Sequence, residues 1–135
     1  ERELDEKVMS LLERLNMADK ADLLAKNLPY GDQRRLEIAR ALMTDPKILL
    51  LDEPVAGMIT TELEEMAQLV AKIRKDFNLS IIMIEHHMNF VMPIADRIKV
   101  VDFGKTISEG TPDVVQKDPK VIEAYLGGGY QNVNA

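Results

Sequence analysis

The pattern of apolar and polar positions predicts helices in the first third of the chain. Residues 1–16 carry an apolar stripe at helical spacing, and a shorter stripe follows over residues 18–26. Pro29 and Gly31 predict a loop at residues 28–32, and residues 33–43 predict a helix that ends before Pro46. The apolar positions expected to face a core are Leu4, Val8, Leu11, Leu12, Leu15, Ala21, Leu24, Ala25, Leu36, Ala39, and either Leu42 or Met43.

Two apolar runs farther along predict strands of a parallel sheet. Residues 47–52 contain four consecutive apolar residues, a run that suits a strand buried on both faces. Residues 79–84 predict the next strand, and the helix between the two opens at Thr61 and Glu64, spaced as a capping box. Its predicted inner face consists of Leu63, Met66, Ala67, Val70, Ile73 and Phe77.

The last third predicts a short helix and a β-hairpin, followed by further short helices. Residues 89–95 suit a helix interrupted by Pro93, and residues 97–103 and 105–108 suit two strands joined at Gly104. Helix starts are predicted at Thr111-Pro112 and Asp118-Pro119, with the last helix ending at residues 127–129 and a tail at 130–135. The fold class expected is α/β, with a parallel sheet core, helices and a terminal hairpin.

Polar residues follow both predicted parallel strands. Asp52 and Glu53 end the first strand directly before Pro54, and Glu85 and His86 follow the second. The carboxyl edge of a parallel sheet is where open α/β folds bind ligands. A core strand that ends in solvated residues is the plain alternative, so the neighbouring segments decide between the two interpretations.

Three motifs in this order resemble the second half of an ABC transporter ATPase subunit: residues 28–35, then Asp52-Glu53, then Glu85-His86. In that family they are the signature motif, the Walker B motif and the switch histidine. Residues 33–42 and 121–127 are similar to the branched-chain amino acid importer group. The resemblance implies a partial ATPase domain with a helical subdomain and signature helix at 1–45, a Walker B and switch-histidine core at 46–110, and carboxyl-terminal helices with a tail at 111–135.

The resemblance also implies roles for individual residues. Asp52 would help to hold Mg²⁺ through water, and Glu53 would polarise the water that attacks the γ-phosphate of ATP. His86 would contact that phosphate. The signature loop, Tyr30, Gly31, Asp32 and Gln33, would contact the ATP held by a partner subunit. A plain loop at a helix start and a structural histidine are the respective alternatives.

Several positions depart from the family pattern. Pro29 and Tyr30 stand where the family has a serine and a second glycine, and Asp32 replaces a glutamine. His87 stands where aspartate is usual. Ile59 stands where an aspartate or asparagine would reach across the subunit interface, and isoleucine makes no such polar contact.

Composition limits the range of functions. The net charge of −6 and the absence of a dense basic block argue against nucleic acid as a partner. There is no cysteine, no apolar run near the ~18 residues of a membrane span, and no signal-peptide pattern. The glycine-rich phosphate-binding loop that ends in Gly-Lys-Ser or Gly-Lys-Thr is also absent. The first residue is Glu1 rather than methionine, so the chain is consistent with a piece of a longer one. With only two histidines and no cysteine, we expect no metal site at Glu85-His86-His87.

The expected function is that of an ATP-binding and ATP-hydrolysing subunit of an ABC importer for branched-chain amino acids, present here without its phosphate-binding loop. Its expected partners are a second ATPase subunit and transmembrane permease subunits, and its expected place is the cytoplasmic face of the cell membrane. The alternative is a non-catalytic module that self-associates and does not hold ATP by itself. A soluble ATPase of DNA repair is a weaker third reading, because the carboxyl-terminal segment resembles the importer group.

Overall fold

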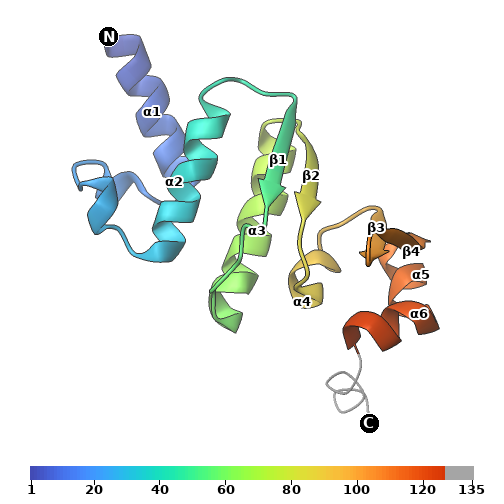
Figure 1. Cartoon of the computed structure of the whole chain (residues 1–135). Coiled ribbons are helices and arrows are strands. Elements are labelled where there is room, and N and C mark those ends of the chain that lie inside the picture. Colours follow the sequence, from blue (N-terminus) through green and yellow to red (C-terminus); the bar gives the residue numbers. More distant parts are fainter. Residues whose placement is uncertain (127–135) are drawn as a thin grey trace. The chain divides into compact units, whose positions relative to one another are not determined.

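The computed structural model describes residues 1–126, which form two compact units that meet in the sequence between Glu85 and His86 (Figure 1). The predicted end of the last helix at 127–129 and the predicted tail lie outside the described residues. The predicted three-segment division of the chain stays a prediction. The first unit consists of α1 (Arg2–Arg14), η1 (Ala18–Lys20), η2 (Ala25–Asn27), α2 (Tyr30–Leu42), β1 (Ile48–Asp52), α3 (Thr60–Asp76) and β2 (Ser80–Ile84).

The centre of the first unit is a β–α–β arrangement, which confirms the predicted α/β fold with parallel strands. β1 pairs with β2 in parallel, in a register that sets Leu50 opposite Ile82 and Asp52 opposite Ile84. Parallel strands need a long crossover, which α3 supplies in the sequence between them. Buried α3 side chains form part of the core of this unit: Met66, Leu69, Val70 and Ile73.

One face of the β1–β2 sheet is exposed, so the prediction that the first strand is buried on both faces is wrong for the described residues. Leu49 is buried, whereas Leu50, next to it in β1, is 71% exposed. The side chains of Ile48, Ile82 and Ile84 are exposed as well. Successive side chains of a strand point to opposite faces, so an apolar layer covers one face only. The apolar run predicts burial correctly for one face, while no element of the first unit covers the other.

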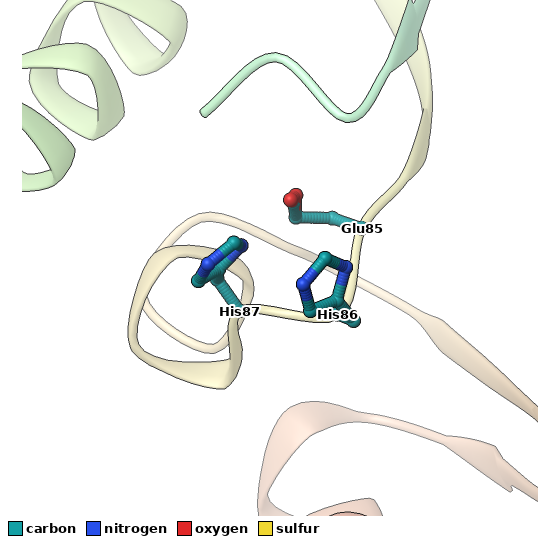
Figure 2. A group of neighbouring side chains, drawn as sticks. All are labelled: Glu85, His86 and His87. Carbon is teal, nitrogen blue, oxygen red and sulfur yellow. The ribbon is translucent and has the colours of Figure 1, made fainter. Parts of the chain in front are cut away.

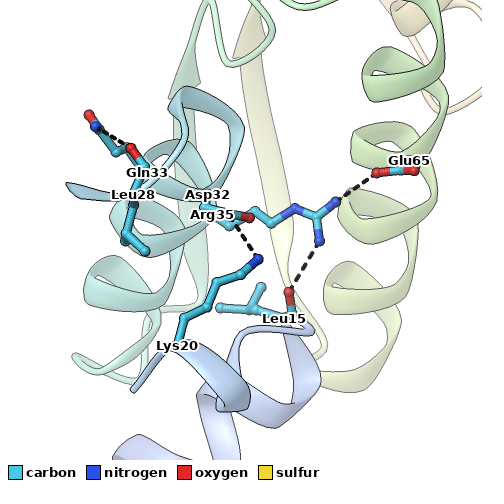
Figure 3. Close-up of polar contacts among 7 residues, drawn as sticks. All are labelled: Leu15, Lys20, Leu28, Asp32, Gln33, Arg35 and Glu65. Carbon is cyan, nitrogen blue, oxygen red and sulfur yellow. Dashed lines mark hydrogen bonds and ion pairs between the residues drawn. The ribbon is translucent and has the colours of Figure 1, made fainter. Parts of the chain in front are cut away.

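Polar contacts connect the three long helices of the first unit (Figure 3). Arg35 of α2 donates to the backbone oxygen of Leu15 after α1 (3.5 Å) and to the carboxylate of Glu65 on α3 (3.1 Å). Lys7 of α1 donates to the Asp45 carboxylate (2.6 Å), just beyond the end of α2. The guanidinium of Arg35 thus connects α2 to the segment after α1 and to α3.

The predicted helix at residues 18–26 is wrong. Two short 3₁₀ turns, η1 and η2, replace it, and the three residues expected to face inward are exposed: Ala21, Leu24 and Ala25. The stripe of α1 is buried only at its end, where Leu11, Leu12 and Leu15 lie in the core while Leu4 and Val8 are exposed. A segment of nine residues is short for a stable helix, and its apolar positions have no neighbour to cover them.

The predicted capping box at Thr61 and Glu64 does not form, because the N-cap of α3 lies two residues earlier. Ile59 is the residue before the helix, and its backbone N–H donates to the carboxylate of Glu62 (2.9 Å). An acidic side chain at the third helical position that reaches back to the preceding N–H is the acidic half of a capping box. The apolar Ile59 side chain provides no reciprocal acceptor.

The second unit is built on the predicted hairpin, which is confirmed. Its elements are α4 (Met88–Val91), β3 (Ile98–Asp102), β4 (Lys105–Gly110), α5 (Pro112–Gln116), α6 (Pro119–Val121) and the π-helical turn η3 (Ile122–Leu126). β3 and β4 are antiparallel, and Phe103 and Gly104 form the turn between them with positive φ angles of 44° and 74°. Ile98 and Val100 of β3 pack with Val115 and Val121 in a small core.

Asp118 connects the hairpin to α6 and yields a prediction of pH dependence. Its carboxylate accepts hydrogen bonds from the Ser108 hydroxyl and from the backbone N–H of Lys120 (3.0 Å). Both bonds favour the charged form, the bond from Ser108 more strongly, and they hold the pKa of Asp118 below its usual value. A lowered pKa adds stability that is present above the unfolded-state pKa and is lost as pH falls through the folded-state pKa.

We therefore expect Ser108→Ala to flatten the loss of thermal stability between about pH 6 and pH 3, which spans the usual aspartate pKa. Ser108→Thr, which keeps the hydroxyl, is the matched control and should retain the steeper loss. Melting curves followed by circular dichroism across this range measure the effect. Identical pH profiles for the parent and Ser108→Ala would show that the Ser108 hydrogen bond does not set the acid response.

No helix among residues 1–126 combines the length and apolar character needed to cross a lipid bilayer.

Candidate functional site

The carboxyl ends of β1 and β2 lie side by side and bring Asp52 and Glu53 to one edge of the sheet. β1 ends at Asp52, and the backbone N–H of Glu53 donates to the carbonyl oxygen of Ile84 at the end of β2 (2.8 Å). The parallel pairing therefore continues one residue beyond the strand. Because β2 leads directly into Glu85, both polar segments begin at the same sheet edge.

Glu53 has an unusual backbone conformation, with a φ angle of 45°. Three of the other non-glycine residues with positive φ are Asn16, Asp45 and Asn78, types that tolerate this region well. A fourth, Phe103, lies in a tight hairpin turn that requires it. Glu53 belongs to neither group, and such strained residues cluster at functional sites.

This conformation changes the expected orientation of the two acids. Successive residues of a continuing strand would point to opposite faces of the sheet. Because the strand ends at Asp52, the left-handed backbone of Glu53, rather than strand alternation, sets the direction of its side chain.

Asp52 lies on the exposed face of the sheet, beside a groove between β1 and α2. Its side chain is exposed, and the groove is also lined by Arg34 and Glu37 of α2 and by Leu50 of β1. An exposed carboxylate at a sheet edge, next to a second one at Glu53, supplies the hard oxygen donors that Mg²⁺ takes together with water and phosphate oxygens. The donor chemistry therefore fits the ion that the sequence analysis assigned to Asp52.

The residues expected to form the signature loop are the first turn of a helix. α2 begins at Tyr30, three residues before the predicted start, so Gly31, Asp32 and Gln33 are helical and Pro29 is the residue before the helix. The Pro29 carbonyl accepts the N–H of Gln33 (3.0 Å). The first N–H groups of a helix have no partner within it and favour an anion.

Gly31 is not required by the packing of the described residues. A Cβ built at this position would meet the Glu62 Oε1 atom at 3.8 Å, an ordinary contact distance. Among the described glycines with positive φ are Gly57, Gly104 and Gly110, and Gly31 is not one of them. The packing of this unit therefore does not require a glycine at position 31, and the missing side chain leaves room for a ligand to approach the backbone from outside the unit.

Tyr30 is held in place by Arg34, one turn farther along α2. The Arg34 guanidinium donates to the Tyr30 hydroxyl through two nitrogens (3.0 and 2.7 Å), and its carbon lies 5.0 Å from the centre of the ring. A hydrogen bond to Glu37 and then the bond to Tyr30 raise the pKa of Arg34. The same ring lies 3.8 Å from where a Cβ of Gly57 would be, so the first turn of α2 lies beside the loop that follows Glu53.

Ile59 closes this loop and is 66% exposed. The resemblance implies a polar residue here that reaches across a subunit interface. Its backbone N–H donates to Glu62, and its carbonyl oxygen accepts the N–H of Leu63 (3.0 Å). Its apolar side chain lies on the surface at the start of α3.

Two further contacts fix the signature turn (Figure 3). The Gln33 side-chain amide donates to the carbonyl oxygen of Leu28 (2.8 Å). The Lys20 ammonium pairs with the Asp32 carboxylate (2.7 Å), and the bond to Asp32 raises the pKa of Lys20. Sequence reasoning missed Lys20, because a lysine twelve residues before Asp32 in an irregular segment gives no periodic signal.

Glu85, His86 and His87 follow β2 and lie close together (Figure 2). One donor atom from each lies within 4.8 Å of the others, and the two imidazole rings are 4.3 Å apart. His86 is exposed and His87 is half-buried. His86 belongs to the second unit, so its approach to a nucleotide beside Glu53 stays a prediction, as does the absence of a metal site here.

Comparisons with known proteins agree with the motifs. Residues 1–56 match the ABC transporter family, and residues 105–131 match the branched-chain amino acid ATP-binding cassette transporter family. The chain is 50% identical over 116 residues to LivG of Escherichia coli (strain K12), a high-affinity branched-chain amino acid transport ATP-binding protein; this covers 86% of the chain and 46% of LivG. The chain belongs to the ATP-binding subunits of ABC transporters.

Other members of the family give the same result. BraF of Pseudomonas aeruginosa, also a high-affinity branched-chain amino acid transport ATP-binding protein, is 46% identical over 127 residues, which cover 94% of the chain and 50% of BraF. An ATP-binding cassette solved in its ADP conformation superimposes with a TM-score of 0.84 at 34% identity, over 94% of the chain and 51% of that structure. The chain thus spans about half the length of the relatives it matches.

Proposed function

We propose that this chain is part of the ATP-hydrolysing subunit of an ABC importer for branched-chain amino acids. The observation that carries the proposal is the strained backbone of Glu53 at the carboxyl edge of a parallel sheet, directly after Asp52. The identity to LivG and BraF supports the substrate class. Family membership implies nucleotide binding, and each site residue can be given a chemical role in it.

Different residues of this chain would have different roles in phosphoryl transfer, which depends mostly on positioning and charge stabilisation. Glu53 is the residue that would hold and polarise the attacking water. Its left-handed backbone ends the strand alternation that applies to Asp52. His86 would contact the γ-phosphate, and the first turn of α2 at Gly31 would present backbone N–H groups to a phosphate of a second subunit.

The proposed cofactor is Mg²⁺, held at Asp52 through water. When bound, it supplies positive charge that offsets the charge on the transferred phosphoryl group. Asp52 offers an exposed carboxylate for it, and Arg34 and Glu37 line the groove beside it. Magnesium sites commonly consist of one or two carboxylates together with water and substrate oxygens.

The proposed partners are a second ATPase subunit and transmembrane permease subunits, and the proposed place is the cytoplasmic face of the membrane. The half-buried Gly31, where no side chain blocks an approach, and the exposed Tyr30 in the first turn of α2 support a contact with a nucleotide held elsewhere. The exposed Ile59 would bring an apolar rather than a polar side chain to the interface with the second ATPase subunit.

A second candidate function follows from the exposed face of the β1–β2 sheet. Ile48, Leu50, Ile82 and Ile84 form an apolar surface that no element of the first unit covers. Surfaces of this kind recruit partners or self-associate. A non-catalytic, self-associating module would use this face and would not hydrolyse ATP even when joined to the rest of its chain.

Steady-state phosphate release from Mg-ATP by the complete subunit that contains this chain tests the proposal. We expect hydrolysis, and we expect His86→Ala to lower turnover by about tenfold to a hundredfold while changing nucleotide affinity less. His87→Ala is the matched control at the adjacent histidine and should retain more activity. A complete, folded subunit without ATPase activity would reject the proposal in favour of the interaction module.

A further inference from the structure

The signature turn carries an acidic residue where a nucleotide phosphate is proposed to approach. Asp32 is the third residue of α2, one position after Gly31. Acidic residues are favoured in the first turn of a helix, because the N–H groups there carry partial positive charge. The same groups would attract a phosphate, so the carboxylate competes with the ligand for them.

Lys20 neutralises that carboxylate from outside the helix (Figure 3). Its ammonium lies 2.7 Å from the Asp32 oxygen, and the side chain of Asp32 is only 14% exposed, with that of Lys20 at 28%. The lysine comes from η1, a short turn that the sequence pattern predicted as part of an amphipathic helix. The ion pair is thus partly shielded from solvent, where charges interact more strongly than on the open surface.

We propose that Lys20 is a positioning residue of the signature turn: its pairing with Asp32 cancels the negative charge and holds the carboxylate aside, which leaves the first N–H groups of α2 available to a nucleotide phosphate. The inference rests on the proposed function and adds a residue that the family motifs do not include. The ligand class is the terminal phosphates of a nucleoside triphosphate.

Neutral variants of the two residues test the proposal in the complete subunit. Lys20→Met leaves the Asp32 charge uncompensated and should raise the KM for Mg-ATP about tenfold, with a smaller change in kcat, because two negative charges within several ångströms repel. The double variant Lys20→Met/Asp32→Asn removes both charges and should return KM to within about twofold of the parent. Added salt should reduce the defect of Lys20→Met, since ions screen the repulsion.

The chain offers a matched control in the pair between Lys7 and Asp45. It has the same chemistry and nearly the same distance (2.6 Å), but lies where α2 ends rather than where it begins. Lys7→Met should leave KM unchanged and affect at most the melting temperature, which is measured for every variant. This comparison separates charge at the signature turn from the general loss of a surface ion pair.

The outcomes are distinct. Rescue of KM by the double variant supports the inference, and a double variant as defective as Lys20→Met overturns it. If Lys20→Met does not fold, Asp32→Asn alone decides: an unchanged or lower KM supports the inference, and a raised KM contradicts it. A parent subunit without ATPase activity would instead reject the proposed function itself, so the two failures are distinguishable.

Discussion

Replacing Glu53 with Gln in the complete subunit should lower ATP turnover about a hundredfold or more, the order of effect expected when a general base or a water-positioning group is lost. Glutamine keeps the size and shape of the side chain but removes its charge and most of its basicity. ATP binding should survive, so ATP-bound dimers should accumulate. The measurements are steady-state phosphate release and sedimentation of the subunit in the presence of Mg-ATP.

Glu64→Gln is the matched control for this change. It removes the same charge from an exposed residue on α3, outside the segment that contains Asp52 and Glu53, and should leave turnover unchanged. If Glu53→Gln hydrolyses ATP at the rate of the parent, Glu53 is not the catalytic carboxylate and the central assignment is wrong.

A polypeptide of these 135 residues alone should bind Mg-ATP at least about a hundredfold more weakly than the complete subunit. The phosphate-binding loop, absent from this sequence, holds the β- and γ-phosphates with its backbone N–H groups and a lysine. Asp52 and Glu53 offer acceptor oxygens only, and these repel phosphate unless a cation lies between them. Isothermal titration calorimetry measures the difference, and circular dichroism verifies that the shorter polypeptide is folded.

Micromolar affinity of the 135-residue polypeptide for Mg-ATP would overturn this prediction and would place the nucleotide on residues already described. Light scattering of the same sample tests the second candidate function. Self-association through Ile48, Leu50, Ile82 and Ile84 should weaken when Leu50 is changed to a polar residue, since Leu50 is the most exposed of the four.

Elements with strong local signals were predicted well from the sequence. The β-hairpin followed from Gly104 between two apolar segments, and the parallel strands followed from apolar runs separated by a helical stripe. Boundaries set by single contacts were predicted less well. α3 begins at Thr60 because Glu62 reaches the N–H of Ile59, a choice that competes with the equally plausible pair of Thr61 and Glu64.

Burial was the least predictable property, because it depends on which segments lie opposite one another. The runs around Leu50 and Ile82 indicate burial, yet no element of the first unit covers one of their two faces. Leu24 appeared to be a core residue of a helix and is exposed in an irregular segment. An apolar side chain tends to be buried, but the local sequence does not say which other segment will pack against it.

For the candidate site, residues in local motifs could be proposed from the sequence, whereas residues defined by contacts in the folded chain could not. Asp52, Glu53 and Gly31 could be proposed from the sequence because each stands in a motif with a definite place relative to a strand or helix. Lys20 and Arg34 could not, since their contacts with Asp32 and Tyr30 depend on the path of the folded chain. The backbone strain of Glu53 likewise has no signature in the sequence.

The backbone strain at Glu53 affects which residues selection would favour at this position. A non-glycine residue at a φ of 45° carries a cost on the order of 1–3 kcal/mol, most of which glycine, and part of which asparagine, would avoid. Selection for folding alone would therefore favour replacement of this glutamate. Under the proposed function, a lineage that no longer needed hydrolysis would gain stability from such a change, so we expect the residue at position 53 to indicate whether a relative of this chain still hydrolyses ATP.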